Sequence, residues 1–187
     1  MYDTSDLRKN LKLTIDGQPY VVIEAQFVKP GKGQAFTRTK MKNMISGSML
    51  ERTYKTGEKF EKADIEERKM QYLYPEDDMS VFMDERTYDQ VRVGKEQLGE
   101  NALYLLDNVV CDVLFYDGRP IGVTPPVFVE MEIVETEPGF KGDTSGNTTK
   151  PAKCTTGLMI QVPLFVNQNE WVKIDTRTGD YVERVKK

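Results

Sequence analysis

The chain has 187 residues, of which 39% are hydrophobic and 30% are charged, and its formal net charge is −4. These proportions are typical of a soluble globular protein, and the chain contains no run of about 18 apolar residues that could span a membrane. The first six residues (Met-Tyr-Asp-Thr-Ser-Asp) lack the basic start and apolar core of a signal peptide, so we expect the protein to stay in the cytoplasm.

The residue types limit the chemistry that this chain can perform. It contains no histidine, which removes the commonest general base and excludes Ser-His-Asp and Cys-His catalysis. Its two cysteines, Cys111 and Cys154, are far apart in sequence, and together with the absence of histidine this argues against a zinc site. We therefore predict no catalytic residue, no metal and no cofactor, and two reduced, buried thiols.

Charge is distributed unevenly along the chain. Residues 1–63 contain 12 Lys or Arg and 7 Asp or Glu, a balance of +5. Residues 64–127 contain 6 and 14, a balance of −8, and residues 128–187 contain 8 and 9, a balance of −1. A basic first third on an acidic body indicates that one end of the protein faces a polyanion, unless charge simply fluctuates between modules.

The first third has the period-two hydrophobic pattern of β-strands. Residues 11–15 and 20–24 flank an Asp-Gly turn and predict a hairpin. Residues 26–28 and 34–42 then flank a turn-rich tip, and we expect a loop at residues 43–47 and a turn at Gly57. Because side chains alternate along a strand, Arg38, Lys40 and Lys42 should lie on one face.

The rest of the chain continues this pattern. In the middle third, a turn at 75–78 joins strands at 69–74 and 79–83, a short helix is predicted at 101–107, and a strand at 109–116 ends in an Asp-Gly turn. Thr-Pro-Pro at 124–126 is a natural linker. In the last third we expect a strand at 128–134, a long loop at 138–152, a strand pair bent at Pro163 over 158–166, and a final hairpin of 171–174 with 181–185. This predicts an all-β protein of three small barrels in tandem, at 1–63, 64–127 and 128–187.

Residues 29–34 (Lys-Pro-Gly-Lys-Gly-Gln) are the most informative segment. Gly31 and Gly33 free the backbone on both sides of Lys32, and Pro30 stiffens the approach to it. Nothing in the segment can bury the lysine, so its amine should project outward, about 10–13 Å beyond the strand ends at ~3.3 Å per residue. The plainer interpretation is a solvated turn with an incidental lysine.

Residues 28–36 (Val-Lys-Pro-Gly-Lys-Gly-Gln-Ala-Phe) resemble the hairpin tip of the bacterial elongation factor P family. Residues 124–130, 138–144 and 175–185 are similar, in order, to the family's domain junction, third-domain loop and C-terminus. The family signature ends in Gly where this chain has Asn169, a residue that tolerates left-handed backbone. Its earlier positions are matched here by Lys150, Ala152, Gly157, Ile160 and Val162-Pro163.

The resemblance implies an SH3-like (KOW-like) first domain followed by two OB-fold domains, with an elongated, tRNA-like outline. It also implies a monomer that binds the 70S ribosome between the peptidyl and exit sites and contacts peptidyl-tRNA. Lys32 would reach toward the peptidyl-transferase centre and relieve stalling at consecutive prolines. A dedicated modifying enzyme adds a β-lysyl group to the matching residue in many members, and hydroxylation is a further modification. The surrounding tip loop is Pro30, Gly31, Gly33 and Gln34.

Several other residues are candidate RNA contacts. Basic side chains on a thin hairpin suit phosphate and ribose contacts, although exposed lysines often serve only solubility. The resemblance implies that the loop at 142–144 approaches the messenger codon in the exit site. The C-terminal residues could stack on or grip tRNA, or simply pack the barrel. The candidates are Lys29, Arg38, Lys40 and Lys42 on the hairpin, Gly142, Asp143 and Thr144 in the loop, and Tyr181 and Arg184 near the C-terminus.

Three alternatives compete with this interpretation. A general RNA-binding OB-fold protein or RNA chaperone would need basic, aromatic-rich barrel faces, against which the −8 middle third argues. An enzyme would need a catalytic motif, and neither paired carboxylates at a useful spacing nor a Walker phosphate loop is present. The elongation-factor-P-like paralogue has a tip that departs from Pro-Gly-Lys-Gly, so this chain fits the parent family better.

Overall fold

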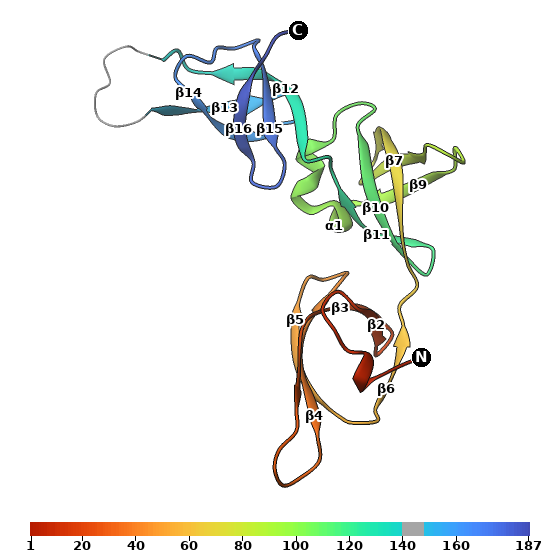
Figure 1. The fold of residues 1–187 in the computed structure, drawn as a ribbon. Helices are drawn as coiled ribbons and strands as arrows, with labels where there is room; N and C mark the ends of the chain where they lie inside the picture. Colours follow the sequence, from red (N-terminus) through yellow and green to blue (C-terminus); the bar gives the residue numbers. More distant parts are fainter. Residues whose placement is uncertain (140–147) are drawn as a thin grey trace. The chain divides into compact units, whose positions relative to one another are not determined.

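The computed structural model of the protein describes residues 1–139 and 148–187. Three antiparallel sheets of six, five and five strands follow one another along the chain, which confirms the prediction of an all-β protein of three β domains (Figure 1). The chain divides into two compact units, residues 1–68 with 113–122 and residues 69–112 with 123–187.

The first sheet has the strand order β1-β6-β2-β3-β4-β5 and closes around a small apolar core. Leu13, Val22 and Met41, from three adjacent strands, are fully buried in it. The hairpin expected around Asp16-Gly17 is present, and both turn residues have positive φ as a two-residue turn requires. The sequence pattern did not predict β1, β5 and β6. The elements are β1 (Tyr2–Asp3), η1 (Thr4–Asp6), β2 (Lys12–Ile15), β3 (Gln18–Val28), β4 (Phe36–Asn43), β5 (Met49–Lys55) and β6 (Lys59–Lys62).

The second sheet has the order β11-β10-β7-β8-β9. The four-residue turn expected at 75–78 is wrong, because Pro75 and Glu76 lie in β7 and only Asp77 and Asp78 turn. Asp77 adopts a φ of 53°, so a two-residue connection suffices. The helical segment also begins earlier than predicted and is mainly 3-10. The elements are β7 (Ile65–Glu76), β8 (Met79–Asp84), β9 (Gln90–Gly94), α1 (Lys95–Leu98), η2 (Gly99–Tyr104), β10 (Val110–Tyr116) and β11 (Arg119–Thr124).

The third sheet has the order β14-β13-β12-β15-β16 and packs around a core that includes Met131, Ile133 and Ile174. The loop predicted at 138–152 ends early, because β13 begins at Thr149. The second half of the strand pair predicted at 158–166 is wrong, because the chain turns after Pro163. Asn169 has a φ of 69°, so it does adopt the left-handed backbone expected of it. The strands are β12 (Phe128–Thr136), β13 (Thr149–Cys154), β14 (Met159–Pro163), β15 (Trp171–Asp175) and β16 (Asp180–Val185).

Candidate nucleic-acid interface

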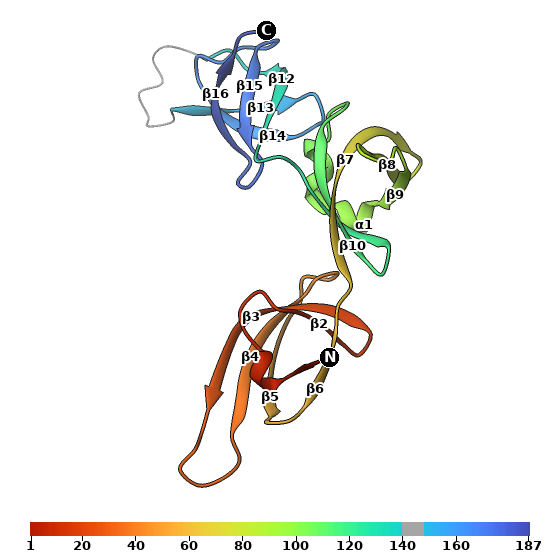
Figure 2. The same ribbon diagram turned by 45° about the vertical axis from the view of Figure 1, so that its right-hand side comes forward.

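The most prominent feature of the first sheet is the β3–β4 hairpin, whose end extends beyond the neighbouring strands (Figure 2). Its two strands pair from Tyr20 with Asn43 to Val28 with Phe36. A register shift between Val22 and Glu24 marks a bulge, which increases the local twist of the ribbon. The hairpin therefore holds residues 29–35 away from the apolar core of its own unit.

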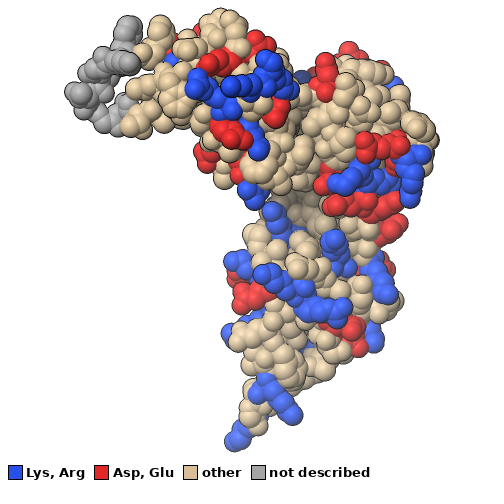
Figure 3. Space-filling view, turned by 45° about the horizontal axis from the view of Figure 1, so that its top comes forward, with Lys and Arg blue, Asp and Glu red and all other residues tan. Residues whose placement is uncertain are grey.

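Lys32 lies at the centre of this tip and is exposed, as the sequence predicted. Neither Lys32 nor Lys29 makes an ion pair or a side-chain hydrogen bond with any residue that the structure describes. Gly33 has a φ of 116°, which only glycine adopts without strain, whereas Gly31 has no such φ. The Lys32 amine is thus presented on a bend of the chain, and no acidic side chain among the described residues neutralises its charge. Figure 3 shows Lys and Arg side chains at this end of the hairpin.

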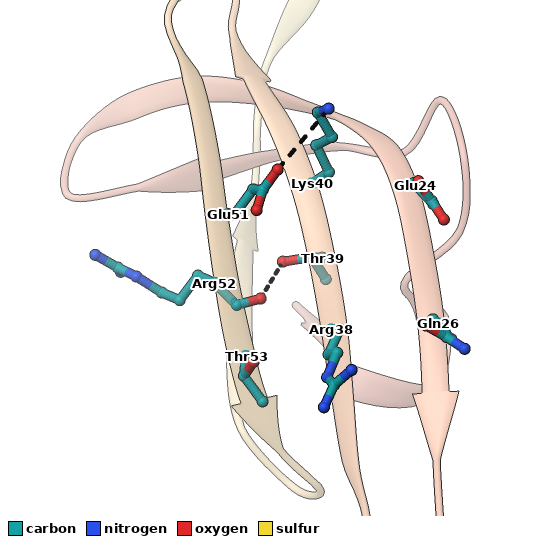
Figure 4. Close-up of a pocket in the computed structure, with 8 residues that line it drawn as sticks. All are labelled: Glu24, Gln26, Arg38, Thr39, Lys40, Glu51, Arg52 and Thr53. Carbon is teal, nitrogen blue, oxygen red and sulfur yellow. Dashed lines mark hydrogen bonds and ion pairs between the residues drawn. The ribbon is translucent and has the colours of Figure 1, made fainter.

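The three basic residues of β4 are exposed on one face of the sheet, as predicted, but their surroundings differ. Lys40 lies in register with Glu24 on β3 and Glu51 on β5, and its Nζ is 3.8 Å from Glu51 Oε1 (Figure 4). Two carboxylates in its own cross-strand row offset the charge of Lys40. The positive charge of Lys40 is therefore less available to a phosphate than its position in the sequence implied.

Arg38 has neutral neighbours instead. Its cross-strand row contains Gln26 on β3 and Thr53 on β5, and its guanidinium lies 5.5 Å from the centre of the Phe36 ring. A guanidinium held against an aromatic ring keeps its N–H groups directed outward, where they can grip a phosphate. Lys42, four residues further from the tip than Arg38, is exposed beside Val21 and Met49.

A cavity of about 340 Å³ opens on this face of the hairpin, over β3, β4 and β5. Arg38, Lys40 and Arg52 are the cations in its lining, and Figure 4 shows the Arg52 side chain extending away from the other two. Thr39 fixes the neighbouring strand by donating a 2.7 Å hydrogen bond to the Arg52 carbonyl oxygen. The residues that line the cavity are Glu24, Gln26, Arg38, Thr39, Lys40, Glu51, Arg52 and Thr53.

A second candidate surface is a groove of about 730 Å³ in the C-terminal sheet, where Tyr181 and Arg184 come together. Arg184 donates to the Glu170 carboxylate at 3.2 Å, and its guanidinium lies 4.7 Å from the centre of the Phe165 ring. Tyr181 packs partly against the buried core and partly lines the groove. The interpretation that Tyr181 packs the barrel is therefore confirmed, and its exposed part leaves the RNA contact as a prediction.

Sequence reasoning missed the other members of this groove. Phe165 is 58% exposed, and Lys187 Nζ lies 4.3 Å from the centre of the Trp171 ring while pairing with Glu130 at 3.1 Å. Aromatic rings beside cations are the surface that single-stranded RNA uses, because bases stack and phosphates pair. The available signal was Trp171, the only tryptophan in the chain, near three C-terminal cations.

The predicted contacts Gly142, Asp143 and Thr144 lie outside the described residues. The structure does describe the residues that flank them. Lys150 is buried and donates from Nζ to the Glu137 carbonyl oxygen at 2.5 Å. The signature lysine thus ties β13 to the chain that follows β12.

The two cysteines are free and buried, which confirms the interpretation of reduced structural thiols. Burial raises the pKa of the Cys111 thiol to about 12 and that of Cys154 to about 11. At neutral pH both are therefore protonated and unreactive. Within residues 1–139 and 148–187, no group of three or more His, Cys, Asp or Glu side chains could hold a metal ion, and no helix is long and apolar enough to cross a membrane.

Comparison with known proteins places this architecture among translation factors. The chain matches the elongation factor P KOW-like domain over residues 3–60, the elongation factor P OB domain over 65–123 and the elongation factor P C-terminal domain over 129–184. It is 53% identical over 186 residues to elongation factor P of Desulfotalea psychrophila and 52% identical over 186 residues to elongation factor P 2 of Geobacter sulfurreducens. Both matches cover 100% of each chain.

A solved structure described as eukaryotic translation initiation factor 5A from Methanococcus jannaschii superposes with a TM-score of 0.56 and 25% identity. The match covers 66% of this chain and 91% of that chain. The KOW-like, OB and C-terminal domains that the chain matches are those of a translation factor. The chain belongs to the elongation factor P family, whose members are translation elongation factors and not enzymes.

Proposed function

We propose that the protein binds the 70S ribosome between the peptidyl and exit sites, contacts peptidyl-tRNA and stimulates peptide-bond formation at consecutive prolines. The observation that carries the proposal is Lys32, exposed and without an ionic partner among the described residues at the end of the β3–β4 hairpin. The membership of the chain in the elongation factor P family supports a role in elongation.

The proposed contribution is positional rather than chemical. Proline is a secondary amine that attacks slowly when it is poorly oriented, and holding two reactants in the productive geometry can accelerate such a step without an acid or a base. A cationic side chain that reaches the acceptor end of peptidyl-tRNA would steady it through phosphate and ribose contacts. Lys32 supplies that cation, and Gly33 fixes the turn that directs it.

The other RNA contacts in this proposal belong to two surfaces. Arg38 and Lys29 on the hairpin hold tRNA phosphates, with Lys42 in support and Lys40 in a lesser role. In the C-terminal domain, Tyr181 and Arg184 contact the tRNA through the groove described above. Gly142, Asp143 and Thr144 would approach the exit-site codon. We also propose that the three domains meet between residues 63 and 64 and between residues 127 and 128.

We further propose that Lys32 is the target of a modifying enzyme, such as one that adds a β-lysyl group. Its amine is an accessible nucleophile at the centre of the tip, and an acyl extension would lengthen the arm. The protein would act in the cytoplasm, where the ribosome is. It would act as a monomer, because its proposed partners are the ribosome and tRNA rather than a second copy of the chain.

The deciding experiment is a reconstituted translation assay with a message that encodes consecutive prolines. Lys32→Ala should abolish the stimulation, and Lys32→Arg should retain part of it because the charge remains although acylation is blocked. Lys153→Ala, an exposed lysine on β13, is the matched control and should behave as wild type. Full stimulation by Lys32→Ala would refute the proposal and favour a general RNA-binding role. Peptide-level mass analysis of protein from its native host would show whether Lys32 carries a group.

A further inference from the structure

A second basic surface lies on the N-terminal unit, on the turn between η1 and β2. Arg8 and Lys9 on the turn and Lys12 at the start of β2 are exposed and line one cavity of about 370 Å³. The rest of its lining is Tyr2, Asn10, Leu11, Ala63 and Ile65, so the described part of the lining contains three cations and no carboxylate.

The turn that carries these cations is held rigidly. Leu7 and Leu11 on either side of it are buried in the core of the first sheet. Leu11 N–H donates to the Arg8 carbonyl oxygen at 3.1 Å, and Asn10 N–H donates to the Val22 carbonyl oxygen at 2.8 Å. Asn10 has the left-handed φ of 70° that asparagine tolerates. A ligand bound here would therefore meet a backbone that is already ordered, which lowers the entropic cost of binding.

The three positive charges are not neutralised within the unit. None of them makes an ion pair with any residue in the described ranges. Of the acids that precede the turn in sequence, Asp3 pairs with Lys59 at 3.9 Å and Asp6 accepts from Asp3 N–H at 2.9 Å, and neither forms an ion pair with Arg8, Lys9 or Lys12. Clustered like charges repel each other, so a bound anion would relieve a cost that the free protein bears.

The kind of anion follows from what else lines the cavity. Tyr2 is its one aromatic ring, and the Lys62 amine already lies 5.1 Å from the centre of that ring. Base stacking therefore has no open platform, in contrast to the C-terminal groove with its exposed Phe165. Cations without stacking partners are suited to the sugar–phosphate backbone, which structured RNA presents on its outside.

We propose that Arg8, Lys9 and Lys12 form a second phosphate-binding surface, which holds the backbone of double-helical RNA independently of the hairpin tip. The inference rests on the proposed function in that it takes RNA as the partner, but it does not need Lys32.

The test compares two triple variants in binding to a 12-base-pair RNA hairpin, followed by fluorescence anisotropy at several KCl concentrations. Arg8→Ala/Lys9→Ala/Lys12→Ala should weaken binding at least ~10-fold at about 50 mM salt and reduce the slope of log Kd against log[KCl] by about 2–3, since each phosphate contact contributes ~0.9. The control, Arg86→Ala/Arg119→Ala/Lys153→Ala, removes three exposed charges elsewhere and should change neither quantity.

Wild-type affinity and slope in the first triple variant, with an unchanged thermal melt, would overturn the inference. So would an unchanged RNA affinity combined with lost binding to poly-glutamate, which would mark the surface as a site for acidic protein. Repeating the titration with Lys32→Ala separates the two proposals. Loss of proline-dependent stimulation in Lys32→Ala with RNA binding intact is the expected result. Intact stimulation in that variant would refute the proposed function. The phosphate-binding surface would then be judged by the RNA-binding data alone.

Discussion

Two glycines flank Lys32, and their backbones make different demands. Gly33 has a φ of 116°, in a region where a Cβ is strained whatever space surrounds it. Gly31 has no such φ, and a Cβ added there would meet nothing within 4 Å. The direction of the Lys32 side chain therefore depends on Gly33 and much less on Gly31.

Substituting each glycine by alanine tests this difference. Gly33→Ala should force the tip into another conformation at a cost of about 1–2 kcal/mol, misdirect Lys32 and lower proline-dependent stimulation. Gly31→Ala should stay near wild-type activity. The reconstituted assay measures both, and the strain should lower the melting temperature of Gly33→Ala slightly while that of Gly31→Ala stays near wild type. Equal activities in the two variants would show that tip geometry does not matter.

Two basic residues of β4, Arg38 and Lys40, allow a second comparison of paired variants. Arg38→Ala should raise the concentration of factor needed for half-maximal stimulation several-fold, since a guanidinium–phosphate contact of about 1–2 kcal/mol is lost. Lys40→Ala should have a smaller effect, because Glu24 and Glu51 already offset that charge. A larger loss in Lys40→Ala than in Arg38→Ala would contradict the assignment. Glu51→Gln is the complementary control, and it should make Lys40 a better ligand.

At the scale of elements, tight turns with a fixed backbone requirement were the most predictable features. Asp16-Gly17 and Asp117-Gly118 both show the positive φ that a two-residue hairpin needs, and both were read from the sequence. The turn near Pro75 was predicted to begin too early. Proline has no N–H, so it can lie within a strand at a position where no N–H is needed for a hydrogen bond between strands. The polar strand β5 was missed, because only Tyr54 of its residues is buried and it therefore has no clear alternation.

The C-terminal sheet contains a close contact that its sequence conceals. A Cβ on Gly139 would lie 2.3 Å from the Leu164 carbonyl oxygen, which is backbone and cannot rotate away. Gly139→Ala should therefore displace the chain after β12 and destabilise the protein by about 1–3 kcal/mol. Thermal or denaturant unfolding would measure this, with Gly122→Ala as the control, because a Cβ there has nothing within 4 Å. Equal stabilities would mean that the chain near Leu164 relaxes freely.

At the scale of the whole molecule, the sequence predicted the exposed tip of the candidate interface better than it predicted the side chains that surround its two cavities. Lys32 was predictable because its exposure follows from local residues alone. The C-terminal groove was only half predictable, because Phe165, Trp171 and Arg184 come from different turns and strands that pairing brings together. The difference between Arg38 and Lys40 depends on Glu51 from another strand, and cross-strand register is a tertiary property.

Acid should weaken the whole fold gradually. Hydrogen bonds from Arg92, Lys95 and Arg177 lower the pKa values of Glu76, Asp78 and Asp175 respectively. A lowered folded-state pKa means that the contribution is present above the unfolded-state pKa and is lost as the pH falls through the folded-state value. All three groups lie on the surface, so the loss below about pH 4 should be shallow and should shrink in high salt.

Alkali should act more sharply, through the buried thiols. Burial raises the pKa of Cys111 from an ordinary value of 9.0 to about 12, so the folded state keeps the proton while the unfolded chain releases it. The stabilising contribution is complete below about pH 9 and is lost as the pH rises toward 12, at up to ~1.4 kcal/mol per pH unit. Between pH 9 and pH 11, Cys111→Ala should therefore lose about 2 kcal/mol less unfolding free energy than wild type, although it is less stable at pH 7 because a buried group is missing. Denaturant titrations across that range decide the matter, since parallel curves for the two proteins would show that the thiol does not stay protonated in the core.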